Sequence, residues 1–295
     1  MRALGRVSRA NPWGSLRLAE VKRGTKAVAI LITLAGLYGA VAGVAAAAQK
    51  RLIYPAPSPV VEPRTRGAEL WRLPGHDGRT VFALYAPAPP GAPTVVHFHG
   101  NGEQLSDQAP LVRALSDAGL GACAVEYPGY GLSRANPPGE QAIYQDAETA
   151  LQHLASLGVP VSSVVLEGQS LGTGVAVEMA RRGYGSRLVL ISPYTSIVDM
   201  ARHVAPFLPV GRLVTERFDT ASKAPGIELP ALVFHGEDDE IIPVSMGRRV
   251  AKLLPHGQLV IIAGGHHNDL FAIDGRDLIR RIVAFARDAS RDRGR

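Results

Sequence analysis

The sequence predicts an α/β fold in which helices cover both faces of a mostly parallel sheet of about eight strands. Apolar segments rich in β-branched residues alternate with helical patterns along most of the chain, and this alternation is typical of parallel βαβ units. The length of 295 residues and the hydrophobic content of 46% are sufficient for one large domain of this class with an appendage. A long uncharged segment near the N-terminus predicts that the appendage is a transmembrane helix.

This segment, Ala27–Ala48, is long enough for the roughly 20 residues that cross a bilayer. It exceeds the apolar core of a signal peptide, so we interpret it as an uncleaved anchor; cleavage within Ala45–Ala48 is the alternative. Residues 1–26 carry seven basic side chains and one acidic one, whereas only Lys50 and Arg51 closely follow the segment. The positive-inside rule therefore predicts a single-pass protein with a basic cytoplasmic arm and a main domain in the periplasm or another extracytoplasmic space.

Charge and cysteine content narrow the choice of partners. The net charge of +6 comes from the basic arm, because basic and acidic side chains are equal in number in the rest of the chain. A nucleic-acid partner is therefore not expected. Cys123 is the only cysteine, which excludes an intrachain disulfide and a cysteine-rich zinc site. The composition leaves the oligomeric state open.

Residues 50–287 should form the α/β domain, and the charged residues 288–295 should form a disordered tail. Apolar side chains fall on one helical face within residues 143–154 and again within residues 278–286. The first two expected strands have no helix between them and should form an antiparallel hairpin at the edge of the sheet. The expected strands are Glu69–Leu73, Val81–Tyr85, Thr94–His99, Gly121–Tyr127, Ser163–Glu167, Arg187–Ile191, Ala231–His235 and Leu259–Ala263.

A serine between two glycines stands in the stretch LEGQSLGTG, residues 166–174. The residues before it resemble a buried strand, and residues 174–181 have a helical pattern. Gly168 and Gly172 indicate a turn too tight for side chains, which would strain the Ser170 backbone and push its hydroxyl into the open. Ser170 is therefore a candidate nucleophile, and an ordinary packing turn is the alternative.

Two later loops offer an acid and a base at the carboxyl ends of strands, where ligands bind in such sheets. A serine hydroxyl needs a base to remove its proton, and the base needs an acid to fix its tautomer. Asp238 and Asp239 follow the strand at 231–235, and the spacing to Pro243 favours Asp239. His266 and His267 follow the last strand.

Other polar residues have competing interpretations. Asp199 is a more distant candidate for the acid. His97 alternates with His99 along a strand, so His97 is interpreted as a core histidine and His99 as a brace for the loop that follows. Residues 126–131 are interpreted as a structural turn. Paired histidines and aspartates also occur in metal sites, but no spacing here fits a metal-binding set, so neither a metal nor a cofactor is expected.

A fourth loop, His99-Gly100-Asn101-Gly102-Glu103, follows the third strand. Acyl transfer develops a negative charge on oxygen, and fixed backbone N–H groups stabilise that charge. Leu171, the residue after the serine, should supply one N–H, and this loop should supply the other. Asn101 is the favoured second donor, with Gly102 as its neighbouring alternative.

The chain resembles the α/β-hydrolase superfamily over about residues 50–287, and within it the membrane-anchored bud-emergence-like branch of α/β-hydrolase-domain proteins. The resemblance rests on RLIYPAP, HFHGNGE, EYPGYGLS, GQSLGTG, ISPYTSI, HGEDDEIIP and HHNDL, and on the order serine, acid, histidine. It implies the α/β-hydrolase fold with Ser170 as nucleophile, Asp239 as acid and His267 as base. The chain departs from the branch in reading Asn-Gly-Glu where Asn-Ala is common, and in doubling the aspartate of the acidic loop.

The resemblance implies a serine hydrolase that cleaves acyl esters or thioesters through a covalent acyl-enzyme. The branch includes thioesterases that act on palmitoylated proteins, and lipases. About one short helix fits between Pro193 and Pro230, at residues 196–207, so the expected lid is small. A small lid and an anchor together favour a membrane-proximal, lipid-like acyl substrate over other small molecules. A serine peptidase of the same fold and a catalytically silent membrane binding protein are the alternatives.

Overall fold

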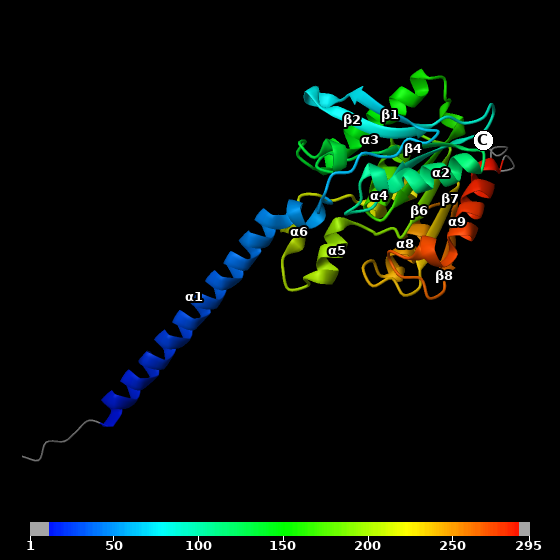
Figure 1. Cartoon of the computed structure of the whole chain (residues 1–295). Helices are drawn as coiled ribbons and strands as arrows, with labels where there is room; N and C mark the ends of the chain where they lie inside the picture. Colours follow the sequence, from blue (N-terminus) through cyan, green and yellow to red (C-terminus); the bar gives the residue numbers. More distant parts are fainter. Residues whose placement is uncertain (1–11, 289–295) are drawn as a thin grey trace, which may run out of the picture. The chain divides into compact units, whose positions relative to one another are not determined.

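Eight strands form one sheet in the order β1-β2-β4-β3-β5-β6-β7-β8 (Figure 1). The computed structural model describes residues 12–288, so residues 1–11 of the expected arm and residues 289–295 of the expected tail lie outside the described residues. The strands are β1 Glu69–Pro74, β2 Thr80–Ala86, β3 Thr94–Phe98, β4 Gly121–Val125, β5 Val164–Gln169, β6 Arg187–Ile191, β7 Ala231–Gly236 and β8 Gly257–Ile262. β2 pairs antiparallel with β1 and β4, and the other neighbouring pairs are parallel. The predicted α/β fold and edge hairpin are therefore confirmed.

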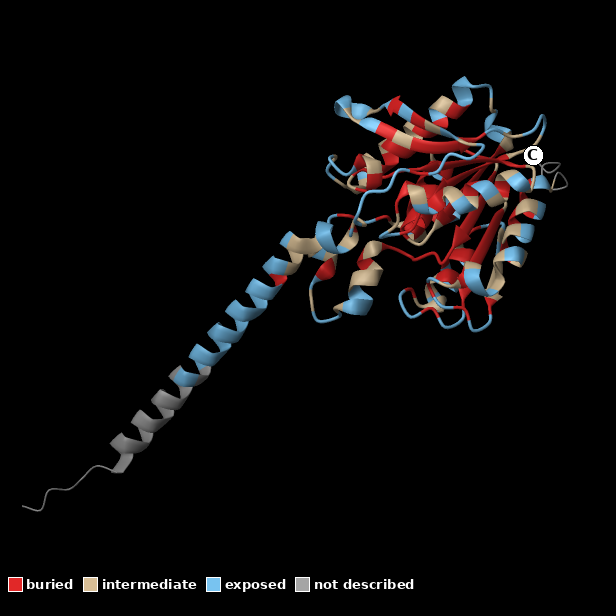
Figure 2. Cartoon of the chain, viewed as in Figure 1, coloured by how far each residue is buried: buried red, intermediate tan, exposed pale blue. Residues whose placement is uncertain are grey.

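Helices cover both faces of this sheet. The described residues form the helices α1 Pro12–Ile53, α2 Ala109–Asp117, α3 Glu140–Ser156, α4 Leu171–Arg181, α5 Ile197–Val204, α6 Val210–Leu213, α7 Thr220–Lys223, α8 Val244–Leu253 and α9 Leu270–Arg287, of which α2, α3, α4, α8 and α9 pack on the sheet. Short 3-10 helices lie at His76–Gly78, Leu105–Gln108, Gly131–Ser133, Val161–Ser163 and Ala224–Gly226. One core packs α3, α4 and α8 against the sheet, through Ile143, Val175 and Val250 among others. A second core packs α2 and α9 against the other face, and Figure 2 shows the buried strands between the two layers.

The differences from the expected elements lie mainly at their ends. β3 ends at Phe98 and β4 at Val125, so His99 and the residues after Val125 belong to loops. α4 begins at Leu171, directly after the serine, rather than at Gly174. The glycines in its first turn have low helix propensity and no apolar side chain, so they hide the start of the helix from periodicity.

The segment between β6 and β7 contains α5, α6 and α7, whereas the sequence predicts one short helix over residues 196–207. α5 follows its N-cap Ser196, whose hydroxyl accepts the Asp199 N–H at 3.0 Å, and it ends at Val204. Pro206 and Pro209 follow, and proline cannot continue a helix because it lacks an N–H and clashes with the preceding turn. α6 and α7 have four residues each, too few for an apolar period to appear in the sequence.

The described residues fall into two units, divided between Ala48 and Gln49. In the first unit α1 includes the expected anchor. The stretch Val28–Ile53 has 26 residues and a mean hydropathy of 2.2, long and apolar enough to cross a bilayer, which makes it a candidate membrane anchor. In the second unit the last turn of α1 is bound to the lid segment, because the Gln49 side-chain oxygen accepts the Thr215 N–H at 2.8 Å.

Candidate active site

Ser170 lies on a sharp turn between the end of β5 and the start of α4. Its φ of 48° is in the left-handed region that side-chain-bearing residues rarely adopt, and its N–H donates to the Ile191 carbonyl at 2.9 Å. A Cβ on Gly168 would lie 2.3 Å from the Gly172 carbonyl oxygen, and a Cβ on Gly172 would lie 1.9 Å from the Phe98 carbonyl oxygen. Both glycines are therefore required for the close approach that makes this turn.

Ser170, His267 and Asp239 lie together at the carboxyl ends of β5, β8 and β7. His267 Nε2 is 3.0 Å from Ser170 Oγ, and His267 Nδ1 is 2.8 Å from Asp239 Oδ2. An ionised carboxylate only accepts hydrogen bonds, so Nδ1 carries the hydrogen and Nε2 is left to accept the serine proton. His267 and Asp239 are both buried, whereas Ser170 is partly exposed. The arrangement can activate a hydroxyl at a position that a substrate can reach.

Both carboxylate oxygens of Asp239 are held. Oδ1 accepts the N–H groups of Ile241 at 3.0 Å and Ile242 at 2.7 Å, and Oδ2 lies 3.3 Å from Nε2 of His235 as well as facing His267. Burial alone would raise the pKa of Asp239, but the hydrogen bonds from His235, His267 and Ile242 hold that pKa well below its usual range. Asp239 is therefore ionised at neutral pH. Sequence reasoning does not single out His235, although its position four residues before the acid, at the head of HGEDD, is a signal for it.

The rival residues lie elsewhere. Asp238 is exposed, and its N–H donates to the Gly265 carbonyl at 3.0 Å. His266 is also exposed, and its Nδ1 pairs with Glu240 at 3.2 Å. Asp199 belongs to α5, where it pairs with Arg202 at 2.8 Å. The structure therefore brings Asp239 and His267 to Ser170 in preference to their sequence neighbours.

The loop after β3 approaches the serine from another side. A Cβ on Gly100 would lie 3.5 Å from the Ser170 Cβ. The Asn101 side chain is engaged, because its Oδ1 accepts a hydrogen bond from the Tyr130 hydroxyl. Leu171 is the first residue of α4, so its N–H is one of the donors that have no acceptor inside the helix and lies at the positive end of the helix dipole. The two expected oxyanion donors thus belong to segments that border Ser170.

The two histidines of the third strand differ in surroundings. His97 is fully buried and lies within hydrogen-bond distance of Glu167 and Gln108, as expected of a core histidine with polar partners. His99 stacks on Tyr127 with ring centroids 3.9 Å apart, and the Tyr127 hydroxyl donates to the His99 carbonyl at 3.0 Å. The turn that contains Tyr127 therefore supports the loop after β3.

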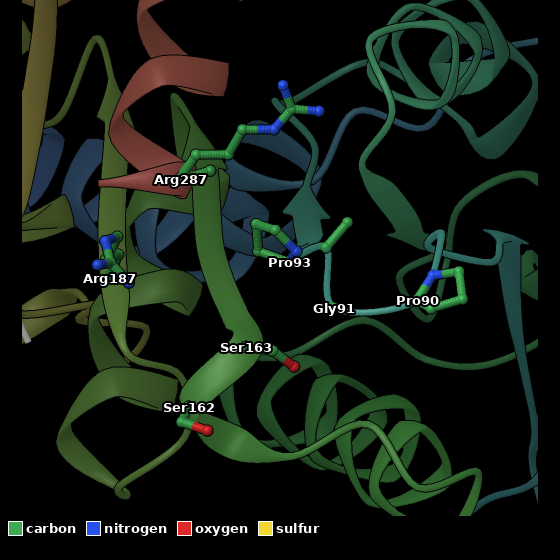
Figure 3. Close-up of a pocket in the computed structure, with 9 residues that line it drawn as sticks. Pro90, Gly91, Pro93, Ser162, Ser163, Arg187 and Arg287 are labelled. Atoms are coloured by element: carbon green, nitrogen blue, oxygen red, sulfur yellow. The ribbon is translucent and has the colours of Figure 1, made fainter. Parts of the chain in front are cut away.

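A hollow of about 400 Å³ opens at the opposite edge of the sheet (Figure 3). Its walls include Pro93 and Ser163, which stand just before β3 and β5, and Arg187, which begins β6. These are the amino ends of parallel strands, whereas ligands bind beyond the carboxyl ends in such sheets. Since neither Ser170 nor its two partners line this hollow, it is separate from the candidate active site.

Comparisons with known proteins connect this chain to a family. A family model described as serine aminopeptidase, S33, matches residues 90–221. An uncharacterised protein of Mycobacterium tuberculosis is 33% identical over 250 residues, which cover 80% of this chain and 87% of that protein. A protein of Acanthamoeba polyphaga mimivirus named as an alpha/beta hydrolase is 32% identical, over 65% of this chain and 73% of that protein. Protein bem46 of Schizosaccharomyces pombe is 31% identical, over 66% of this chain and 71% of that protein.

Solved structures share the architecture. An esterase from Exiguobacterium antarcticum superimposes with a TM-score of 0.60 over 74% of this chain and 99% of the esterase, at 16% sequence identity. At that identity the likeness concerns the fold.

Proposed function

The chain belongs to the α/β-hydrolase superfamily, in the branch of bem46 and the α/β-hydrolase-domain proteins, and on this premise we propose that it is a serine hydrolase of acyl esters or thioesters. Membership of this family supports a hydrolase function. The observation that carries the finer proposal is the hydrogen-bonded series Ser170, His267, Asp239 on a strained turn at the carboxyl edge of the sheet. In our proposal Ser170 is the nucleophile, His267 the general base and Asp239 the acid.

The proposed reaction proceeds in two halves. His267 Nε2 takes the proton from Ser170 Oγ as that oxygen attacks the substrate carbonyl carbon, and Asp239 stabilises the resulting imidazolium. The backbone N–H groups of Leu171 and Asn101 stabilise the negative oxygen of the tetrahedral intermediate. The bond from carbon to the leaving oxygen or sulfur then breaks, and His267 returns the proton to the leaving group. Water, deprotonated by the same histidine, hydrolyses the acyl-enzyme and restores the serine.

The proposed substrate class is a membrane-proximal acyl chain. The candidate anchor would keep the domain close to a bilayer, and the last turn of α1 is bound to the lid segment. The lid consists of short helices that leave Ser170 partly exposed, which suits a substrate that approaches from a membrane. Within the acyl class the proposal favours esters and thioesters over amides, because their leaving groups depart more readily than an amine.

The experiment that tests the proposal compares two serines with positive φ. Ser170→Ala should abolish labelling by a fluorophosphonate probe and lower the turnover of p-nitrophenyl esters by about 10³-fold or more, because the nucleophile is lost. Ser192 also has a positive φ, of 50°, but it is buried and has no histidine among its hydrogen-bond partners in the described residues. Ser192→Ala should keep both labelling and turnover. Unchanged turnover in Ser170→Ala would remove Ser170 as the nucleophile.

Two alternatives have distinct signatures. The description of the matching family model favours a peptidase, which would release p-nitroaniline from aminoacyl anilides faster than it cleaves acyl esters of matched size. A catalytically silent binding protein would react with no serine probe and would hydrolyse no short ester. The integrity of the Ser170–His267–Asp239 geometry supports the enzymatic proposals over the silent one.

A further inference from the structure

A polar chain runs through the sheet behind the loop that carries Asn101. It begins with Glu167 of β5 and His97 of β3, which are register partners on neighbouring parallel strands. Glu167 Oε2 lies 3.1 Å from His97 Nδ1, and neither side chain is more than 1% exposed. Burying such a pair in an otherwise apolar sheet costs free energy, and a hydrophobic pair of similar volume would usually be at least as stable. Stability alone therefore does not account for this pair.

The polar chain of hydrogen-bonded side chains continues from His97 to the loop after β3. His97 Nε2 is 3.0 Å from Gln108 Oε1, and the Gln108 amide donates to Glu103 Oε2 at 3.4 Å. The same Glu103 oxygen accepts the Gly100 N–H at 2.8 Å. The far end of the polar chain thus binds the backbone of the loop itself, one residue before Asn101.

Gly100 is held at its carbonyl as well as at its N–H. His99 Nδ1 donates to the Gly100 carbonyl at 2.8 Å. That carbonyl shares a peptide plane with the Asn101 N–H, and the two groups point in opposite directions across a trans peptide. Fixing Gly100 at both groups therefore fixes the direction in which the Asn101 N–H points.

The directions of the hydrogen bonds in this polar chain require a cationic His97. The Glu167 carboxylate and the Gln108 carbonyl oxygen only accept, so both His97 nitrogens must carry hydrogen. If Nε2 loses its hydrogen, the Gln108 amide must turn its NH₂ group toward His97 and its oxygen toward Glu103. Two acceptors would then face each other, which would weaken the hold of Glu103 on Gly100.

The charged groups that face His97 are Glu167 from β5 and Glu103 from the loop. Burial alone would lower the pKa of His97, but these two carboxylates and the Gln108 contact raise it above its usual value. The surroundings of His97 therefore favour the cationic form that the geometry requires.

We propose that Glu167, His97, Gln108 and Glu103 are positioning residues that hold the Asn101 N–H in place for the oxyanion, and that protonation of His97 controls this hold. The inference rests on the proposed serine hydrolase function and adds a pH-sensitive control that acts on the oxyanion loop from the centre of the sheet. The hold is complete while His97 is protonated and is lost as the pH rises through the pKa of His97.

The first test separates kcat from KM on p-nitrophenyl acetate, with the full chain in detergent. Glu103→Ala and Gln108→Leu should each lower kcat about tenfold and leave KM within about twofold, because a misplaced oxyanion donor weakens only transition-state binding. The matched control is Asp107→Ala, since Asp107 is a nearby acid that accepts the Gln104 N–H instead of the Gly100 N–H. An unchanged kcat in Glu103→Ala, or an equal fall in Asp107→Ala, would overturn the inference.

The second test measures kcat as a function of pH and uses the alkaline side of that profile. Glu167→Gln keeps the shape of the side chain but removes the charge that favours cationic His97, so the alkaline fall in kcat should move to lower pH by about one unit. In the Gln108→Leu background the same substitution should cause no such shift, because the connection to Glu103 is already broken. Equal shifts in both backgrounds would contradict a relay through Gln108.

A readout independent of turnover distinguishes this inference from the proposed function. Amide hydrogen exchange of the peptide that contains residues 99–104, at one fixed pH, should be several-fold faster in Glu103→Ala than in the wild type. Glu103 is half-buried, so the substitution should leave the rest of the sheet unchanged, and peptides from β6 and β7 serve as the reference. Unchanged exchange overturns the inference even if the wild type is an active hydrolase. Faster exchange in Glu103→Ala, together with a wild type that hydrolyses no ester, would retain the hold on the loop and reject the proposed function.

Discussion

At the scale of single residues, the acidic loop after β7 places two aspartates in very different surroundings. Asp239 is buried against His267 and accepts two backbone N–H groups, whereas Asp238 is exposed. The backbone at adjacent positions sends neighbouring side chains in different directions, so only one of the pair can reach the histidine. The low pKa of Asp239 keeps its charge available to the imidazolium at neutral pH.

The adjacent aspartates provide a direct prediction. Asp239→Asn should lower kcat by about 10³–10⁴-fold, because an amide in this place favours the wrong histidine tautomer and no longer stabilises the cation. Asp238→Asn should change kcat by less than about twofold, and it serves as the matched control. Steady-state turnover of a p-nitrophenyl ester measures both. The reverse ranking would assign the acid to position 238.

At the scale of elements, α4 is held to its neighbours by a buried carboxylate. Glu178 is 3% exposed and binds Arg181 and Arg182 of the same helix region and Lys223 of α7, the last at 2.8 Å. Burial alone would raise the pKa of Glu178, but the hydrogen bonds from Arg181, Lys223 and Arg182 lower it to about 2. Because α4 carries the serine turn at its N-terminus, this cluster secures the helix at its other end.

The lowered pKa of Glu178 predicts a pH-dependent stability. A depressed folded-state pKa stabilises the native state above the unfolded-state value of 4.5, and this contribution is lost as the pH falls toward about 2. Glu178→Gln should therefore lower the thermal midpoint at pH 7 by several degrees, since hydrogen bonds to charged groups contribute about 1–3 kcal/mol. The difference between variant and wild type should shrink steadily below pH 4.5.

Circular dichroism melts of the full chain in detergent would measure this effect. Glu148→Gln is the matched control, because Glu148 pairs with Arg182 but is 25% exposed at its side chain. Its substitution should shift the midpoint by less than half as much. A Glu178→Gln shift that is the same at pH 3 and pH 7 would contradict an electrostatic origin.

At the scale of the whole molecule, the charge flanking the candidate anchor predicts an orientation. Seven basic side chains precede Ala27, and Lys50 and Arg51 closely follow Ala48. The positive-inside rule therefore favours a cytoplasmic N-terminus with the hydrolase domain across the membrane. Alkaline phosphatase fused to the C-terminus should be active in a bacterial host, and a fused cytoplasmic fluorescent reporter should be dark. The opposite pair of signals would reverse the orientation, and a soluble hydrolase domain would indicate cleavage within Ala45–Ala48.

The sequence by itself determined the features that depend on local chemistry. Buried strands are short apolar runs rich in β-branched residues, and their alternation with helical patterns is sufficient to predict the sheet and its edge hairpin. The serine turn is also local, because Gly168 and Gly172 are required within two residues of Ser170 for the backbone to close. The candidate anchor follows from length and hydropathy alone.

Only the tertiary structure decided the features that depend on contacts distant in sequence. Which of two aspartates and two histidines meets Ser170 depends on how β5, β7 and β8 align, and His267 lies 97 residues from the serine. The contact between His235 and Asp239 depends on how strands align, and so does the series of hydrogen bonds from Glu167 to Gly100. Sequence periodicity does not reveal these contacts, since a buried polar residue has no periodic pattern of its own. The short lid helices likewise depend on tertiary packing, because α7 packs against α4 and α8, and α5 packs against α6. Periodicity predicts where a segment lies relative to a core, whereas strand register decides which side chains become partners.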